Sequence, residues 1–310
     1  GKKPLQFSSS LSHSKQFLFS GNSRDVDRSK SFNITTLSMG IAKRLTVPDD
    51  FFVFQSSVSF QFYDLNNYNT GLFTFGDGYS NNLSYTIGLN RNNTYNDPIF
   101  PTGGSNFNVS AKLSLPYSLF NNVDYAALKD ERDEQTEIIN DFSNTQTVRN
   151  EASDRVAEID QERFKWLEFY KIKFKADWYT SVIGKFVLRP SLEFGFLGAY
   201  NNDRGVIPFE RFFLGGDGLG SYSLDGREAI ALRGYPNQSL QPENDNGTVS
   251  NDGGTIYNKF SLELRYPITL KQSAKIYVLG FLEGGVSYND FKDYNPFNLK
   301  RSAGLGLRIF

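Results

Sequence analysis

The chain has no cysteine, which excludes disulfides, thiol nucleophiles and cysteine metal sites. Its single histidine, His13, would have to carry any histidine-based triad or metal site alone, and an ordinary strand position is the better interpretation. No apolar run approaches the roughly 18 residues that a membrane helix needs. The net charge of −1 over 310 residues gives no reason to expect a nucleic-acid partner. The chain opens on Gly1 without an initiator methionine or signal peptide, so we expect a mature chain or an excerpt from a longer one.

Aromatic residues are abundant instead, with 29 Phe and 17 Tyr. Many of them belong to an alternation of apolar and polar residues with a period of two, which is the pattern of a strand with two different faces. In one such segment the apolar face holds Phe52, Phe54, Val58, Phe60 and Phe62, and the polar face holds Gln55, Ser57, Ser59 and Gln61. The pattern predicts ten strands, within 5–19, 37–41, 52–62, 83–89, 107–115, 170–178, 186–196, 256–266, 276–287 and 302–309.

The length of these strands decides between two classes of fold. A soluble sandwich also alternates, but the predicted strands run to roughly 10 to 17 residues, where soluble strands average about 5 to 6. Aromatic residues collect near strand ends, for example at Phe17, Tyr63, Tyr200 and Tyr288. Aromatic girdles, an apolar outer face and a polar lumen are typical of outer-membrane barrels. We therefore predict an all-β fold, a transmembrane antiparallel up-and-down β-barrel with long extracellular loops, whose barrel domain covers residues 1–310.

The connections between the predicted strands alternate in length, as such barrels require. Short turns at 47–50, 181–184 and 270–273 should be periplasmic, together with the longer segment 96–104. The links at 20–31, 64–81, 116–163, 201–255 and 289–299 should be extracellular. Within 116–163, eleven acidic residues lie between Asp130 and Glu162. We expect this insertion to be a solvated lid that forms a surface helix or stays partly disordered.

The link 201–255 is rich in glycine. Its run Gly215–Gly220 is not followed by a helical pattern, so tight turns are a better interpretation than a phosphate-binding loop. The runs 244–247 and 251–254 offer oxygen ligands for calcium, but their spacing is not that of an EF-hand. We predict no metal site and no cofactor.

Two carboxylates stand out by their position in the alternation. Glu263 and Glu283 have the parity of the polar, inward face, on strands that should be neighbours. A buried acid without a cation is costly, and Arg233 is the unassigned cation, provided that 201–255 folds back into the lumen. We predict this contact as structural, with no catalytic residue, and the chain is not expected to be an enzyme.

Two motifs resemble those of the BamA family of outer-membrane assembly factors, within the surface-antigen superfamily, and especially its Bacteroidetes version. One is an arginine-glycine-aromatic motif behind the block Phe209–Gly216, here Arg233, Gly234 and Tyr235. The other is the family's periplasmic turn, here Phe100, Pro101, Thr102 and Gly104. The strands around Glu263 and Glu283 resemble those that receive the loop arginine in that family.

The resemblance implies a sixteen-stranded barrel, of which this chain would hold about ten strands, without the periplasmic POTRA domains and the first and last strands. It implies a core subunit of the machinery that assembles and inserts β-barrel proteins into the bacterial outer membrane. The implied partners are unfolded outer-membrane proteins, accessory lipoproteins and membrane lipid. Arg233, Gly234 and Tyr235 would anchor the long loop in the lumen, where Glu263 and Glu283 would receive it.

Other functions stay open at this point. A two-partner secretion transporter or a TamA-like paralogue would share the same motifs. A ten-stranded barrel protease would need His13 and acids at the extracellular rim. A passive porin would need a lumen that the long loop leaves open.

Overall fold

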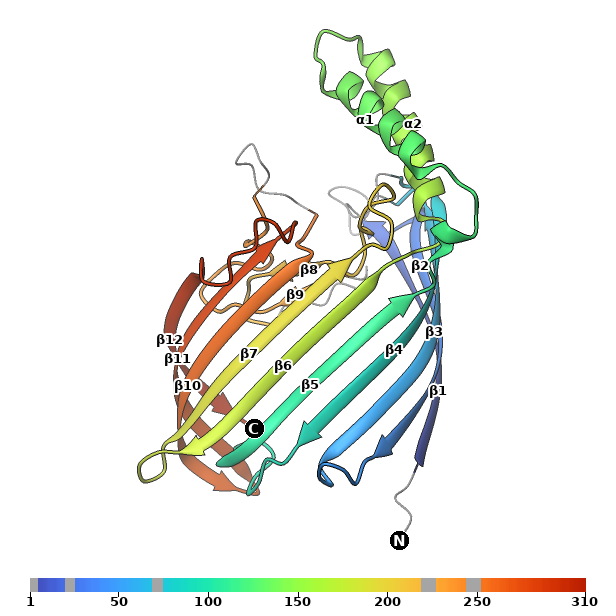
Figure 1. Cartoon of the computed structure of the whole chain (residues 1–310). Coiled ribbons are helices and arrows are strands. Elements are labelled where there is room, and N and C mark those ends of the chain that lie inside the picture. The colour runs from blue at the N-terminus through green and yellow to red at the C-terminus, as the bar shows by residue number, and fades with distance from the viewer. Residues whose placement is uncertain (1–4, 20–25, 69–74, 219–226, 244–251) are drawn as a thin grey trace.

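A computed structural model of the chain describes residues 5–19, 26–68, 75–218, 227–243 and 252–310. Ten long strands form one antiparallel sheet that curls into a barrel wall (Figure 1). In spatial order they are β1 (Leu5–Phe19), β2 (Val26–Arg44), β3 (Phe52–Asn66), β4 (Gly78–Asn92), β5 (Gly103–Ser114), β6 (Tyr170–Ser181), β7 (Val187–Gly198), β10 (Ile256–Lys271), β11 (Ala274–Tyr288) and β12 (Lys300–Ile309). The predicted all-β barrel with ten long strands is confirmed.

Two short parallel strands, β8 (Phe212–Leu214) and β9 (Glu228–Ile230), lie in the long loop that connects β7 to β10. Among the described residues, no helix is long and apolar enough to cross a membrane.

The pairing register gives the sheet one apolar and one polar face. Phe60 pairs with Leu37 of β2 and Leu83 of β4, whereas its neighbour Ser59 pairs with Ser38 and Ser84. Because side chains alternate between faces, each such row is uniform in character. The apolar face points outward and is widely exposed, a surface that a soluble protein would bury but a bilayer would cover.

The polar face, which lines the lumen, differs between the two halves of the wall. Between their ends, β1 to β4 present uncharged side chains: Gln6, Ser8, Ser10, Ser12, Ser38, Gln55, Ser57, Ser59, Gln61, Asn82, Ser84 and Thr86. The strands from β5 to β11 present charged ones: Lys112, Lys171, Lys173, Lys175, Asp177, Arg189, Glu193, Lys259, Glu263, Arg265 and Glu283. The charged half is therefore the half that can hold an ionic partner.

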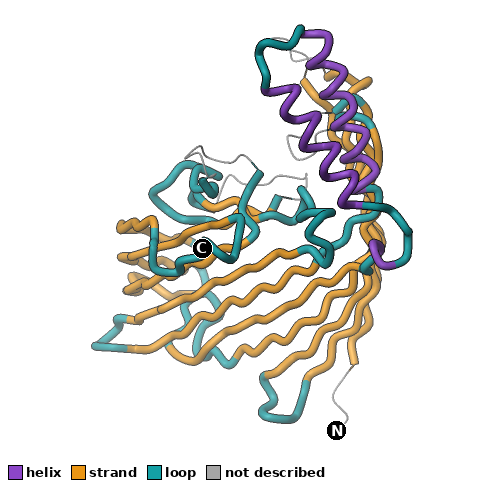
Figure 2. Tube along the Cα trace, turned by 45° about the horizontal axis from the view of Figure 1, so that its top comes forward, coloured by secondary structure: helices purple, strands orange, loops and turns teal. Residues whose placement is uncertain are grey.

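The acidic insertion forms two helices, α1 (Tyr125–Asn140) and α2 (Gln146–Phe164), after a short 3-10 turn (Tyr117–Leu119). Asp124 and Thr145 cap their N-termini by accepting hydrogen bonds from backbone N–H groups. The helices pack as a hairpin that stands up from the rim rather than lying across the mouth (Figures 1 and 2). Cross-helix ion pairs, Arg132 with Asp160 and Arg155 with Glu131, neutralise part of the acidic charge.

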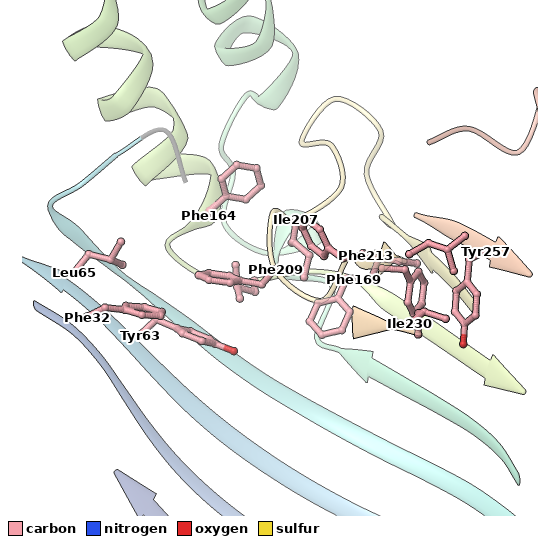
Figure 3. Close-up of a cluster of buried hydrophobic side chains, with 14 of the residues drawn as sticks. Phe32, Tyr63, Leu65, Phe164, Phe169, Ile207, Phe209, Phe213, Ile230 and Tyr257 are labelled. Atoms are coloured by element: carbon pink, nitrogen blue, oxygen red, sulfur yellow. The ribbon is translucent and has the colours of Figure 1, made fainter. Parts of the chain in front are cut away.

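A cluster of apolar side chains fills the end of the lumen from which the helical hairpin rises (Figures 1 and 3). It joins Phe32 and Tyr63 of the wall to Ile207, Phe209 and other residues of the β7–β10 loop. The ring of Phe209 stacks on Tyr63, with centroids 4.4 Å apart. The loop therefore crosses the mouth of the barrel and packs against β2 and β3 on the far side.

Candidate functional site

The β7–β10 loop turns sharply where the sequence contains Gly215 and Gly216. Both have positive φ angles, 120° and 99°, and a Cβ on Gly216 would lie 2.0 Å from Asn237 Oδ1. The turn brings Gly216 N–H to the carbonyl of Tyr235 (3.1 Å). These glycines therefore serve the tight turn that positions the arginine motif, while Leu219 and Gly220 lie outside the described residues.

Arg233 projects from this turn toward β10 and β11. Its Nη2 donates to Glu263 Oε1 (2.8 Å) and to Glu283 Oε1 (2.6 Å), and its backbone N–H donates to Glu283 Oε2 (2.9 Å). Both carboxylates are buried. Burial by itself would lower the pKa of Arg233, but its bonds to Glu283 and Glu263 raise that pKa above the usual value. The arginine therefore stays charged inside the lumen.

The two glutamates also have partners on the wall. Glu263 Oε2 accepts from Arg265 Nε (2.8 Å) and from Arg189 Nη1 (3.1 Å). Glu283 Oε1 accepts from Ser261 Oγ (3.2 Å) and lies 3.4 Å from Lys259 Nζ. The wall thus contributes its own cations, and Arg233 adds one more that belongs to the loop.

Close packing on the other side fixes the arginine motif. The guanidinium carbon of Arg233 lies 3.8 Å from the ring centroid of Phe281, a cation–π contact. Gly234 has a φ of 88°, and Tyr235 Oη donates to the carbonyl of Arg301 in β12 (2.8 Å). Sequence reasoning assigned no role to Phe281, although it shares the inward parity of Glu283.

A second ionic contact of the loop was also missed at the sequence level. Glu210, which precedes β8, binds Lys112 of β5 and Lys171 of β6, the latter at 2.9 Å. Glu228 of β9 binds Lys171 (2.5 Å) and Lys173 (2.8 Å). Burial would raise the pKa of Glu210, but Lys171 and Lys112 hold it well below its usual range. The inward lysines of β6 were the available signal, since they too require counter-charges.

The predicted periplasmic turn folds into the other end of the lumen. Phe100 is buried and packs edge-on against Tyr277 of β11, with centroids 5.1 Å apart, and beside Val187 of β7. Asp97 accepts from the backbone N–H of Phe100 (3.1 Å) and forms an ion pair with Lys275 of β11 (2.8 Å). A turn between β4 and β5 is thereby attached to the opposite part of the wall.

The remaining residues of the turn motif shape the backbone. Pro101 is buried, and Thr102 accepts from Asn96 through its hydroxyl and from Ser181 Oγ through its carbonyl (2.9 Å). Gly104 has a φ of 89°, and a Cβ there would lie 2.4 Å from the carbonyl oxygen of Asn93. Only glycine fits this position without strain.

In the part of the chain that the structure describes, no group of three or more His, Cys, Asp or Glu side chains is placed to hold a metal ion. Most of the calcium candidates, Asn244–Gly247 and Asn251, lie outside the described residues. His13 Nδ1 lies 2.9 Å from Thr35 Oγ1, in the row that continues the outward face.

The sequence matches the model of the Omp85 superfamily domain over residues 2–309. No curated protein matches it significantly.

Among solved structures, the chain is similar to BamA from Haemophilus ducreyi lacking POTRA domains 1–3. The TM-score is 0.60 at 16% identity, and the match covers 98% of this chain and 52% of that one. It is also similar to CdiB from Escherichia coli, with a TM-score of 0.48 at 13% identity, covering 99% of this chain and 44% of that one. The chain thus spans about half the length of these proteins. The likeness to the Haemophilus protein shows the same barrel fold, and the match over nearly the whole sequence shows that the chain belongs to the Omp85 superfamily.

Proposed function

We propose that this chain forms the barrel wall and lumen plug of a bacterial outer-membrane protein that folds and inserts other β-barrel proteins. The observation that carries the proposal is the pair of salt bridges from Arg233 to Glu263 and Glu283, inside a barrel of the Omp85 superfamily. The partners would be unfolded outer-membrane proteins, accessory lipoproteins and the surrounding lipid. The role of these salt bridges is structural, and the proposed folding and insertion of client barrels needs neither nucleotide nor metal.

The anchored loop would keep the wall in shape while a client strand is added. It binds β10 and β11 through Arg233, β12 through Tyr235, and β5 and β6 through Glu210. On the far side it packs on β3 through Phe209. A client barrel grows by backbone pairing with strand edges, so a machine that opens its wall locally needs the rest of the wall to be held. The loop supplies that hold and also blocks the lumen.

The test is the variant Arg233→Ala in the intact protein, with Arg233→Lys and Arg44→Ala as controls. Removing one partner of a buried pair costs about 3 to 5 kcal/mol when the other charge is left uncompensated. Glu263 and Glu283 keep the wall cations Arg189, Arg265 and Lys259, so the loss of Arg233 should cost less than that. We expect Arg233→Ala to slow the folding of a client barrel into vesicles that contain the protein, and to lower the amount of folded outer-membrane proteins in cells. Arg233→Lys keeps the charge but loses the planar guanidinium that stacks on Phe281, so its effect should be smaller than that of Arg233→Ala. Arg44 is exposed, and its removal should have no effect.

Two outcomes would contradict the proposal. Unchanged folding of client barrels by Arg233→Ala would remove the role of the anchored loop. Normal client folding together with a failure to export a soluble partner protein would assign the chain to two-partner secretion instead.

A further inference from the structure

One junction of the wall, at the end of the barrel opposite the helical hairpin (Figure 1), leaves a strand edge without a neighbour. Pairing between β10 and β7 ends where Arg265 lies opposite Val187. β10 itself continues to Lys271, and so does its pairing with β11, which ends at Ala274. Residues 266–271, which we call the β10 tail, therefore have a paired strand on the β11 side and, among the described strands, none on the β7 side.

The other junctions at this end of the barrel are flush. β3 begins at Phe52, which pairs with Arg91, next to the last residue of β4. β5 begins at Gly103, which pairs with Thr180, next to the last residue of β6. β12 is paired with β11 up to its own last residue. The free edge of the β10 tail is therefore a local feature, and the general stagger of tilted strands does not account for it.

A bulge changes the side chains that the β10 tail presents. It follows Pro267, and Ile268 is the extra residue that has no partner in β11. Because side chains alternate with a period of two, one extra residue reverses the alternation beyond it. Leu270 therefore has inward parity, opposite Lys275, whose ion pair with Asp97 lies inside the lumen. The tail thus turns an apolar side chain inward, and its proline is typical of a strand edge.

A cavity of about 380 Å³ lies along the β10 tail. Ile268 and Leu270 line it, together with residues of the β6–β7 turn and Phe100 of the β4–β5 turn. Ile268 is 59% exposed, so the tail is open to an incoming chain. Lys185, in the β6–β7 turn, is the one charged residue of the lining, and it is exposed as well. The free edge therefore lies beside an apolar cavity that carries a single positive charge.

We propose that the β10 tail binds an extended segment of a periplasmic partner protein, which adds a strand to the free edge. Such an edge offers backbone N–H and C=O groups with which a second chain can pair. The cavity takes an apolar side chain of that segment and Lys185 an acidic one, because the lining contains no acid. The occupant is therefore a segment in which apolar and acidic residues alternate.

The position of the edge also separates it from the growth of a client barrel. Above the β10 tail, β10 stays paired with β7 as far as Arg265, so a partner can bind here without opening the wall. The periplasmic location of this end of the barrel rests on the function proposed above, whereas the free edge and its cavity do not.

The test is disulfide trapping of a synthetic peptide by the intact protein in detergent, because residues 1–310 contain no cysteine of their own. Ile268→Cys places a thiol on the β10 tail, and Leu270→Cys is a second position. Phe142→Cys, at a site 83% exposed on the tip of the helical hairpin, is the control. The probe is an acetylated peptide amide of alternating valine and glutamate with one central cysteine.

Two further peptides serve as controls. One carries lysine in place of glutamate, and the other carries methyl groups on its backbone nitrogens, which removes its hydrogen-bond donors. Heat-modifiable migration on gels verifies that each protein variant is folded.

We expect Ile268→Cys to trap the glutamate peptide several-fold more than Phe142→Cys does, and to trap the methylated peptide no more than that control. Adding Lys185→Glu should reverse the preference, so that the lysine peptide is trapped better than the glutamate peptide. Lys292→Glu changes an exposed residue at the other end of the barrel, and it should leave the preference as it was.

Three results would overturn the inference: no excess of trapping at the β10 tail, equal trapping of the methylated peptide, or equal trapping of the glutamate and lysine peptides. Folding of a client barrel by the unmodified protein, measured on the same preparation, tests the proposed function separately. Client folding without trapping overturns the β10 tail site alone, whereas trapping without client folding overturns the proposed function alone.

Discussion

Arg233 reaches both glutamates because small residues around it leave space. Phe281 stacks on the guanidinium, and behind its ring lies Gly304 of β12, where a Cβ would stand 2.6 Å from the ring. On the loop side, a Cβ at Gly234 would lie 3.1 Å from Ser302 Cβ. Close packing therefore positions Arg233 as much as the charges of the two glutamates do.

This packing predicts the effect of Gly304→Ala. The added methyl group would push Phe281 toward Arg233, and overpacking of this kind costs about 1 to 3 kcal/mol. We expect a lower unfolding temperature and faster protease cleavage of the β7–β10 loop.

Gly280→Ala in β11 is the matched control, since its Cβ would meet only Leu305 Cδ2, at an ordinary 3.6 Å. Equal behaviour of the two variants would show that Phe281 does not transmit strain to the arginine.

The parity of a residue in the alternation predicts which face of the wall it lies on, but it carries no information about the loop. Alternation alone placed Glu263 and Glu283 on the inward face, where the structure has them. The contacts of Glu210 with Lys112 and Lys171 could not be derived in this way. They join residues far apart in sequence, and one partner lies in a loop that has no strand period.

At the element scale, the β4–β5 turn is attached across the lumen by Asp97 and Phe100. The bond from Lys275 is the main reason why the pKa of Asp97 lies below its usual range, and backbone N–H groups of the turn add to it. A carboxylate with a lowered folded-state pKa stabilises the fold above its unfolded pKa of about 3.9, and this contribution disappears as the pH falls through the folded value.

We therefore expect the intact protein to lose stability below about pH 4, and Asp97→Asn to flatten this part of the profile. Unfolding midpoints measured between neutral and acid pH would show it. Asp293→Asn, which removes one exposed carboxylate from the β11–β12 segment, is the control. A profile of Asp97→Asn that follows the unmodified protein at every pH would contradict the role of the turn.

The strands were predictable because each repeats one rule over many residues, whereas the connections do not. The sequence of the acidic insertion is compatible with a helix or with disorder. Its many charged residues make the short apolar stripe of Ala152, Val156 and Ile159 difficult to recognise in the sequence. The segment 289–299 was expected only as an extracellular link, and its contact with Phe196 depends on the shape of the folded wall.

For the whole molecule, the hairpin and the lumen loop are joined at one buried ion pair. Arg204, at the start of the loop, donates to Glu168 at the foot of the hairpin (2.8 Å), and both side chains are almost fully buried. Arg163 of α2 donates to the carbonyl of Arg204 (2.5 Å). These buried contacts therefore attach the hairpin to the same loop that carries Arg233.

Glu168→Gln should weaken the attachment of the hairpin to the loop, because breaking a buried ion pair costs about 3 to 5 kcal/mol. We expect trypsin to cut the hairpin at Lys129 and Arg149 about tenfold faster or more. Glu131→Gln breaks only an exposed ion pair with Arg155, so it should change the cutting rate little. Equal rates for both variants would mean that the hairpin is held by other contacts.

The lumen loop is held by ions at β5, β6, β10 and β11, but by stacked rings where Phe209 meets Tyr63. Salt acts on these two kinds of contact in opposite directions. Screening weakens ion pairs, although least where they are buried, whereas sulfate strengthens the association of apolar groups. The concentration of a sulfate salt should therefore decide whether the loop detaches first from the ionic side of the barrel or from the side where Phe209 stacks on Tyr63.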